Sequence, residues 1–490
     1  MLFRTITLLW LAVTGCVPSS PYNTCELGDT TEVHFEDTEM LCVQLELSDW
    51  AFYQLSRQFR FYGSSGDQFA GVIGHMLTSC DEPFPDPYTY FAADLWVGEL
   101  QASDIGVRKK GFIGSTIGNS VERPSLRVKT DKFIDGQALN ESTVITLNNN
   151  NTDATRVRTC LTYYAFQQAG YPAPRCNLAN VMVNGQSLGT YTHVEAVKEP
   201  FLLREFGNDH GSLYELTITD FSEAHLANGL GRWEADTETT SQSTELLLAV
   251  ATALASDNGS LESELSQVIE LDMFLDFWAL ETLLGHTDGY TANGNNSYVY
   301  FDPDREHRAV MIPWGPDDAM QGNDLTLSQP ISETEGPDAE TELNFFVNGA
   351  ISRRISQHPE LYQRYLERIQ HLLDQVWDED SMLEKYEQLQ QQVETAETLT
   401  DDQNTATDSL EKWIESRRSI VVTFIANGGA EGLPGSVECF DEKLGEGEEL
   451  GELAELVSTA SYSCSTGPAN KAVAWMLGLA VFGWRTRRQS

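Results

Sequence analysis

The chain has 490 residues and a formal net charge of −43 at pH 7, with ordinary apolar, glycine and proline contents. This length favours one large two-lobed body with tails, and the composition predicts that most of the chain folds. A surface this acidic repels phosphate backbones and no basic stripe compensates locally, which disfavours nucleic acid as a partner and favours basic proteins or cations.

The first residues have the pattern of an export signal. Arg4 precedes an apolar run, residues 6–13, which ends in Val-Thr-Gly-Cys at Cys16. The pattern is typical of a bacterial lipoprotein signal cleaved before a lipidated cysteine, with a plain secretory signal cut nearby as the alternative. We therefore expect removal of residues 1–15 and a tether over residues 16–42 at the outer membrane or cell surface.

The predicted body spans residues 43–427, and its first half is rich in strand patterns. Four segments have strand character, namely residues 43–47, 91–97, 105–112 and 125–129. A short helix is predicted after the first of them, from Asp49. Residues 155–169 have helical spacing and stop at Gly170, a common C-terminal signal. Asn184-Gly185 then predicts a hairpin between residues 180–183 and 189–197.

The second half of the body predicts mainly helices. Residues 268–284 are apolar nearly all round, which indicates a helix inside a lobe. Residues 361–376 have an amphipathic pattern, and a third helix is predicted near residues 410–425. Residues 428–463 are rich in Gly and Glu and are expected to form a solvated acidic linker. The predicted fold class is therefore α+β, with a strand-rich N-terminal half and a helix-rich C-terminal half.

The last residues, 464–490, form a second candidate targeting signal. Cys464-Ser-Thr-Gly-Pro precedes an apolar stretch, residues 472–484, and arginines follow it. This stretch is shorter than the roughly 20 residues that a bilayer span needs. It resembles the MYXO-CTERM kind of sorting tail, which directs a protein to the cell surface and is then removed. A short amphipathic or buried terminal helix is the alternative.

Export would place the other cysteines in an oxidising compartment. Setting Cys16 and Cys464 aside leaves six of the eight cysteines, without a C-x-x-C spacing, so a zinc site and a thioredoxin-like motif are disfavoured. They are Cys25, Cys42, Cys80, Cys160, Cys176 and Cys439. Up to three disulfides are expected, and their pairing does not follow from sequence. Cys160 and Cys176 flank one predicted helix and are the preferred pair.

Residues 278–320 carry the candidate chemistry. Asp288 follows the buried helix directly, so its backbone is anchored while its side chain projects toward a cleft. Two predicted strands, residues 297–301 and 309–312, form a hairpin behind it. Aspartate in a Gly-rich loop also forms turns and caps helices, and such a role is the alternative for Asp288.

The hairpin brings further oxygen ligands toward this loop. Asn296 precedes the first strand, and the second strand leads into Pro-Trp-Gly-Pro-Asp-Asp at residues 313–318. Phosphoryl transfer needs a carboxylate near the acceptor, oxygen ligands for Mg²⁺, and cations or amides for the phosphates. The layout therefore favours phosphoryl transfer. The chain lacks the GxxxxGK[ST], GxSxG and HExxH motifs, and His193-Val-Glu195 favours a structural role over a metal pair.

The sequence contains several further blocks of interest, namely residues 105–111, 117–120, 125–129, 144–151 with Arg156, 183–195, 201–214 and 278–320. In their order and spacing these blocks resemble the spore coat protein CotH family of secreted atypical kinases, which are distantly related to the kinase fold. The resemblance covers roughly residues 43–427. The implied fold is an atypical two-lobed kinase, and the implied activity is transfer of the ATP γ-phosphate to Ser or Thr.

The resemblance implies roles for individual residues. Asp288 matches the catalytic loop acid that positions or deprotonates the acceptor hydroxyl, and Asn296 matches the asparagine that helps to hold Mg²⁺ or Mn²⁺. Lys129 and Arg127 are the expected phosphate cations, and Glu195 is the acid expected to orient such a cation. The implied partner is an envelope or coat protein, basic and rich in Ser and Thr.

The chain departs from the family pattern near the expected metal. Where the family usually has Trp-Asp, this chain has Trp314-Gly315, and glycine offers no side-chain oxygen. Asp317 is then the expected second metal ligand, with Asp318 in reserve. If the site has this geometry, Gly315→Asp should raise metal affinity.

Two further departures remove positive charge. Ile117 stands where the family usually has Arg, and Glu215 where it has Lys, which lowers charge complementarity to phosphate. Two functions therefore stay open: an exported, surface-tethered kinase, or a catalytically impaired CotH-like module that acts as a binding or structural surface protein.

Overall fold

The computed structural model describes residues 35, 39–60, 71, 75, 81–112, 120–139, 142–235, 243–321, 346–429 and 433–434. The predicted signal peptide and sorting tail lie outside these residues, as do nearly all of the acidic linker, most of the tether and the departure at Ile117. Within the described part of the chain, no helix has the length and apolar content needed to cross a membrane.

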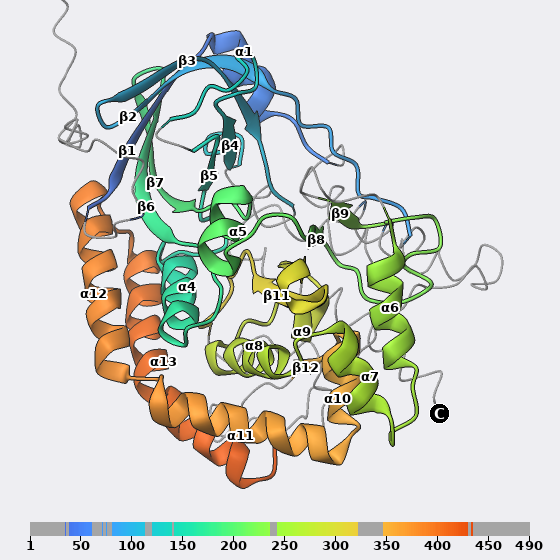
Figure 1. Ribbon diagram of the computed structural model, residues 1–490. Helices are drawn as coiled ribbons and strands as arrows, with labels where there is room; N and C mark the ends of the chain where they lie inside the picture. Colours follow the sequence, from blue (N-terminus) through green and yellow to red (C-terminus); the bar gives the residue numbers. More distant parts are fainter. Residues whose placement is uncertain are drawn as a thin grey trace, which may run out of the picture.

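Seven of the described strands close into a barrel, seen at the top of Figure 1. The order around it is β1-β2-β3-β4-β5-β7-β6, and all neighbours are antiparallel except β1 with β6. The strands are β1 Leu41–Glu46, β2 Phe91–Val97, β3 Leu100–Lys109, β4 Leu126–Lys129, β5 Val144–Asn148, β6 Cys176–Val183 and β7 Gln186–Val194. Alternate side chains face inward and pack as an apolar cluster, so the barrel has a core of its own.

The β6–β7 hairpin shows how local sequence sets the register. Asn184 and Gly185 form its turn between the paired residues Val183 and Gln186, with φ values of 51° and 74°. Asn and Gly tolerate this left-handed conformation, and such a turn matches the twist of the flanking strands. The predicted hairpin is confirmed, although its first strand begins earlier, at Cys176.

A second, antiparallel sheet lies between the barrel and most of the helices (Figure 1). Its order is β11-β10-β8-β9, with β8 Ser212–Leu216, β9 Trp233–Ala235, β10 Ser297–Asp302 and β11 Arg308–Pro313. Helix α8, Leu271–Leu284, packs against β11. Trp278 of α8 stacks on Tyr365 of helix α11, Pro359–Gln375, with ring centroids 3.7 Å apart. This stacking joins the buried helix to the outer helical layer.

The other helices surround these two sheets. They are α1 Asp49–Ser56, α4 Arg158–Gln168, α5 Glu199–Phe206, α6 Glu245–Leu254, α7 Leu261–Val268, α9 Tyr290–Asn293, α10 Ala350–Ser356, α12 Glu379–Ala396 and α13 Asp401–Ala426. A 3-10 turn spans Pro303–Arg305, and the short strands β12 Phe346–Val347 and β13 Leu433–Pro434 pair with each other. The helices predicted in the second half are present as α8, α11 and α13. Helix α13 begins earlier than predicted because Thr400 and Gln403 form a capping box.

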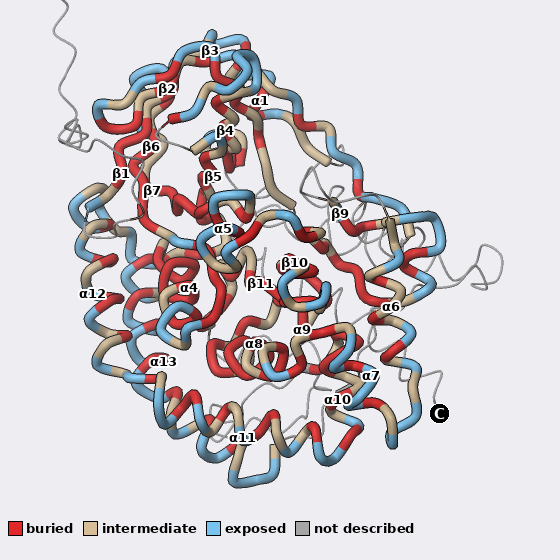
Figure 2. The backbone as a smooth tube through the Cα atoms, in the orientation of Figure 1, coloured by how far each residue is buried: buried red, intermediate tan, exposed pale blue. Residues whose placement is uncertain are grey.

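The fold is mixed α+β, with a strand-rich N-terminal half and helices in the C-terminal half, as predicted. The closed barrel was not foreseen in the two-lobed description. Figure 2 shows buried backbone in the barrel wall and around α8, which correspond to two separate apolar clusters. The body therefore has one core inside the barrel and a larger one around α8.

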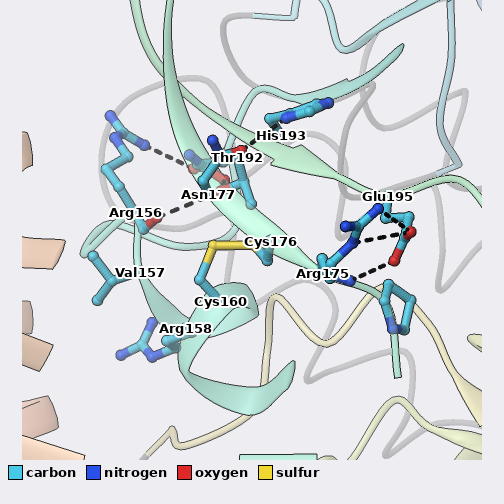
Figure 3. Close-up of a disulfide and its surroundings, with 12 residues drawn as sticks. Arg156, Val157, Arg158, Cys160, Arg175, Cys176, Asn177, Thr192, His193 and Glu195 are labelled. Atoms are coloured by element: carbon cyan, nitrogen blue, oxygen red, sulfur yellow. Dashed lines mark hydrogen bonds and ion pairs between the residues drawn. A yellow bond between two sulfur atoms is a disulfide. The ribbon is translucent and has the colours of Figure 1, made fainter. Parts of the chain in front are cut away.

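A disulfide joins Cys160 of α4 to Cys176 at the start of β6, which confirms the preferred pair (Figure 3). Both residues belong to or pack against the larger core. The bond therefore fixes α4 to the lower rim of the barrel. Cys42 is also disulfide-bonded.

Candidate functional site

Helix α8 and its C-terminus position the candidate loop. The helix is buried along most of its length and ends at Gly285, whose φ of 61° is the left-handed conformation common after helices. Arg417 of α13 donates from Nε to the carbonyl oxygen of Leu283 at 2.6 Å and from Nη2 to that of Thr282 at 2.5 Å. These bonds satisfy carbonyls that a helix end leaves unpaired, so the start of the loop is fixed from a distant helix.

The loop then turns around the buried carboxylate of Glu281. This carboxylate accepts the backbone N–H groups of Tyr290 at 3.2 Å and Thr291 at 2.9 Å, and so caps the short helix α9. Burial raises the pKa of Glu281. A Cβ atom at Gly289 would collide with the same carboxylate, so only glycine fits this position. The turn holds Asp288 between two anchored segments.

Asp288 is surrounded by asparagine amides. Its Oδ1 accepts from Nδ2 of Asn293 at 2.6 Å and of Asn295 at 3.1 Å, and its Oδ2 accepts from Nδ2 of Asn296 at 2.7 Å. Burial, followed by the nearby charge of Asp318, raises the pKa of Asp288 to about 7. The carboxyl group is therefore fixed in direction while it can still change protonation state near neutral pH.

The β10–β11 hairpin brings the second group of acids to this loop, as predicted. Ser297 pairs with Pro313, and the N–H of Trp314 donates to the carbonyl oxygen of Asn296 at 3.1 Å. Asp317 lies in the following turn and accepts a hydrogen bond from Thr152, in the loop between β5 and α4. Burial raises the pKa of Asp317 to about 6. The barrel side of the molecule thus contacts the acids directly.

His286 connects the Asp288 loop to Asp318. Its Nδ1 lies 3.2 Å from Oδ1 of Asp318, whose Oδ2 accepts from Oγ1 of Thr287 at 3.0 Å. Burial alone would lower the pKa of His286, but Asp318, Glu281 and Asp288 together raise it to about 9. A protonated imidazole therefore offsets part of the negative charge gathered here.

Gly315 lies directly against Asn296. Its φ is 54°, and a Cβ atom placed on it would be 2.9 Å from Oδ1 of Asn296. A side chain at this position would consequently point at the candidate metal oxygen. The aspartate that Gly315 replaces would therefore have lain within the candidate metal site.

The predicted phosphate cations lie on the outer face of β4. Lys129 is opposite Gly106 in the register with β3, and its Nζ is 3.7 Å from Oδ1 of Asp131. Arg127 is opposite Arg108 and therefore lies closer to the end of β3 that leads to the second sheet. The structure brings Arg127 nearer to the acids than Lys129.

Glu195 lies in a different cluster (Figure 3). Its Oε1 accepts from Nη2 of Arg175 at 2.7 Å and from Nε at 3.1 Å, and its Oε2 accepts from the backbone N–H of Arg175 and from Arg204. The cations that Glu195 orients are thus these two arginines. Nearby, burial and Arg175 lower the pKa of His193 to about 3, and its Nδ1 bonds Oδ1 of Asn177 at 2.7 Å, in agreement with a structural role.

Sequence reasoning missed several neighbours of the acids. Asn293 and Asn295 contact Asp288, and His286 and Thr152 contact the second acid group. The run of asparagines after Asp288 was a visible signal, because amides five to eight residues along a tight loop can return to the same carboxylate. Thr152 gave no such signal, since its contact depends on how the barrel packs against the hairpin.

The donor set suits a hard divalent cation. Asn296 donates through Nδ2 and so directs its Oδ1 away from Asp288, while Asp317 adds a partly buried carboxylate whose pKa is raised mainly by desolvation. Mg²⁺ and Mn²⁺ favour such oxygen ligands. In the described residues no three His, Cys, Asp or Glu side chains converge as a metal site. The candidate set differs from that kind of site because it includes an amide oxygen.

The sequence was also compared with known proteins. The family model described as CotH kinase protein matches residues 110–428, which is more than half of the chain. The matched part includes Asp288, Asn296 and Asp317, and it begins at Lys110, directly after β3. A search of curated proteins found no match.

Proposed function

Because the chain belongs to the CotH kinase protein family, we propose that it is an exported, surface-tethered kinase that transfers the γ-phosphate of ATP to Ser or Thr of an envelope or coat protein. The observation that carries this proposal is the setting of Asp288. Its carboxyl group is held by three asparagine amides at the end of a buried helix and lies beside a second group of acids.

Each side chain has a role in this proposal. Asp288 positions the acceptor hydroxyl and accepts its proton, for which a pKa near the working pH is suited. Asn296 and Asp317 would hold Mg²⁺ or Mn²⁺. Arg127 is a candidate cation for the phosphates of the nucleotide. The bound ion would supply charge neutralisation for the phosphates. His286 holds Asp318 and limits repulsion among the acids.

Export and tethering rest on separate support. The disulfide between Cys160 and Cys176 is of the kind that persists in oxidising compartments. The lipoprotein-type signal ending at Cys16 and the tail from Cys464 both suggest attachment to the outer membrane or cell surface, by a lipid anchor or by sorting. The net charge of −43 favours a basic protein substrate and disfavours nucleic acid.

Gly315 favours a second function. It offers no carboxylate at the position that contacts Asn296, so the chain would hold a metal with fewer charged ligands than the family pattern supplies. In this alternative the protein is a CotH-like binding or structural module of the cell surface without transfer activity.

Labelling with γ-labelled ATP separates the two functions. The purified protein would be incubated with Mg²⁺ or Mn²⁺ and a basic, Ser/Thr-rich peptide, beside Asp317→Asn and, as a matched control, Asp374→Asn on the exposed side of α11. A kinase labels the peptide in a metal-dependent way that Asp317→Asn abolishes and Asp374→Asn does not. Unlabelled peptide with retained folding would favour the binding module.

A further inference from the structure

Lys110 extends from the barrel toward the second sheet. It follows the last residue of β3, and its Nζ donates to Oδ1 of Asn148 at the end of β5 at 2.6 Å. Its predecessor Lys109 points the other way and is fully buried, with its Nζ 2.9 Å from the carbonyl oxygen of Ser56. Strand alternation therefore places two adjacent lysines on opposite faces, and only Lys110 faces the acids.

The surroundings of Lys110 belong to the other sheet. Its Nζ lies 5.8 Å from the ring centroid of Trp314, which meets Tyr298 edge to face at 5.3 Å between centroids. The hydroxyl group of Tyr298 donates to Oε2 of Glu215 at 2.7 Å. Lys110 thus lies where the barrel, β8 and the turn after β11 meet.

Charge at this junction holds the ammonium group in place. Burial lowers the pKa of Lys110 to about 8, and the negative charges of Glu215 and Asp317 oppose this shift. Glu215 and the candidate metal ligand Asp317 therefore lie close enough for their charges to act on the ammonium group. An anion bound beside Asp317 would therefore lie close to this cation.

The sequence-based candidate Lys129 lies much further away. The N–H of Lys110 bonds the carbonyl oxygen of Ser125, whereas Lys129 is four residues further along β4. At about 3.4 Å per residue this separates their backbone levels by about 14 Å. Lys129 is also engaged by Asp131, and Arg127 lies between the two levels.

We propose that Lys110, held by Asn148 and attracted by the charge of Glu215, is the cation that binds the phosphates of the nucleotide beside Asp317. This inference rests on the proposed function, because it takes a nucleoside triphosphate as the ligand. Glu215 then favours nucleotide binding, because its charge orients the lysine in addition to repelling the phosphates.

Calorimetric titration of ATP and AMP in the presence of Mn²⁺ tests the assignment. Lys110→Met should weaken ATP binding by about tenfold to a hundredfold, the value of a lost charge-assisted contact, and should change AMP binding much less. Lys412→Met, on the exposed face of α13, is the matched control and should bind ATP as the wild type does. Lys129→Met is the rival variant, and a selective loss of ATP binding there, with Lys110→Met unaffected, would overturn the assignment.

A charge-reversed pair of variants separates a loss of ATP binding from a loss of folding. Lys110→Glu alone should abolish ATP binding, and Lys110→Glu combined with Glu215→Lys should restore at least tenfold of the lost affinity, because the pair then keeps one cation at the junction. Melting curves of all variants show which remain folded. A folded double variant that binds as weakly as the single one would contradict the proposal.

The two proposals fail in different ways. If the wild-type protein binds neither ATP nor AMP, the proposed kinase function is wrong and Lys110 has no nucleotide to bind. If the wild-type protein binds ATP and Lys110→Met binds it equally well, the family-based function stands and only the role of Lys110 is wrong.

Discussion

Two acidic clusters in this molecule, one buried and one partly buried, differ in how their charge is balanced. Glu195 is almost fully buried and receives two arginines, Arg175 and Arg204, together with a backbone N–H. Arg175 also lies 4.7 Å from the ring centroid of Phe35. Every oxygen of this carboxylate is matched by a cation, so the cluster is complete as it stands.

The cluster around Asp288 has a surplus of acid. Asp288, Asp317, Asp318 and Glu281 lie close enough to influence one another or the same histidine. Among the described residues, His286 contacts Asp318 and the charge of Lys110 acts on Asp317, which still leaves the acids in excess. Asparagine amides bind Asp288 but bring no charge. A buried carboxylate without a counterion is costly, and the fold retains these acids at a loop rather than in a core. The balanced cluster stabilises the fold, whereas the surplus indicates a place for a cation.

The largest expected effect follows from removing the charge at the centre of the surplus. Asp288→Asn should lower the rate of phosphate transfer by about 10²- to 10⁴-fold, because an amide cannot accept the proton of the hydroxyl group. Its melting temperature should change little, since one repelling charge is lost along with the bonds to the asparagines. Single-turnover labelling and a melting curve measure both quantities. Full transfer activity in this variant would assign Asp288 a purely structural role.

The corresponding change in the balanced cluster should lower stability and leave activity unchanged. Glu195→Gln leaves two arginines without their partner and should lower the free energy of unfolding by about 1–2 kcal/mol, an amount reduced because both arginines are partly exposed to solvent. Labelling activity should stay close to that of the wild type. Urea unfolding and labelling decide the point, and a lost activity with unchanged stability would place Glu195 in the site after all.

The sequence predicted the local parts of the fold and not their closure. Alternating residues and the Asn184-Gly185 turn were sufficient for β1, β2 and the β6–β7 hairpin, because each depends on neighbours along the chain. The parallel pairing of β1 with β6 joins segments that are far apart in sequence, so no local pattern indicated the barrel. Helix α12 was overlooked, although Met382, Tyr386, Leu389 and Val393 form a narrow apolar stripe on it.

The candidate site was predictable to the same extent. The hairpin spacing was sufficient to place Asn296 beside the turn that contains Asp317. The spacing was not sufficient to identify the phosphate-binding cation. Lys110, Arg127 and Lys129 all lie on or next to one strand pair, and only the packing of the barrel against the second sheet separates them. Charge balance at Glu195 likewise depends on Arg175, directly before β6, and on Arg204 of α5, and no sequence pattern connected these two arginines with Glu195.

Gly315 offers a way to enlarge the surplus. Gly315→Asp adds a left-handed aspartate against Asn296, which should cost about 1 kcal/mol of stability without metal. With Mn²⁺ the melting temperature should rise more than in the wild type, since a further carboxylate reaches the cation. Gly170→Asp is the matched control, because its φ of 67° is similar and no atom lies near its Cβ position. Equal metal-dependent shifts in the two variants would contradict the site geometry.

The surplus cluster should also give the stability a pH dependence that the balanced cluster does not. Burial raises the pKa of Asp288 to about 7 and of Asp317 to about 6, from 3.8 in the unfolded chain. The folded state therefore binds protons more tightly, so the stability that these groups contribute is fully present below about pH 4 and is lost as the pH rises toward 7. Mn²⁺ should offset this loss, and its stabilising effect should grow between pH 5 and pH 8. Urea midpoints of the wild type and of the Asp288→Asn, Asp317→Asn double variant measure it, with Glu195→Gln as the comparison that keeps the wild-type slope. A double variant with the same pH slope as the wild type would show that these acids carry no unbalanced charge.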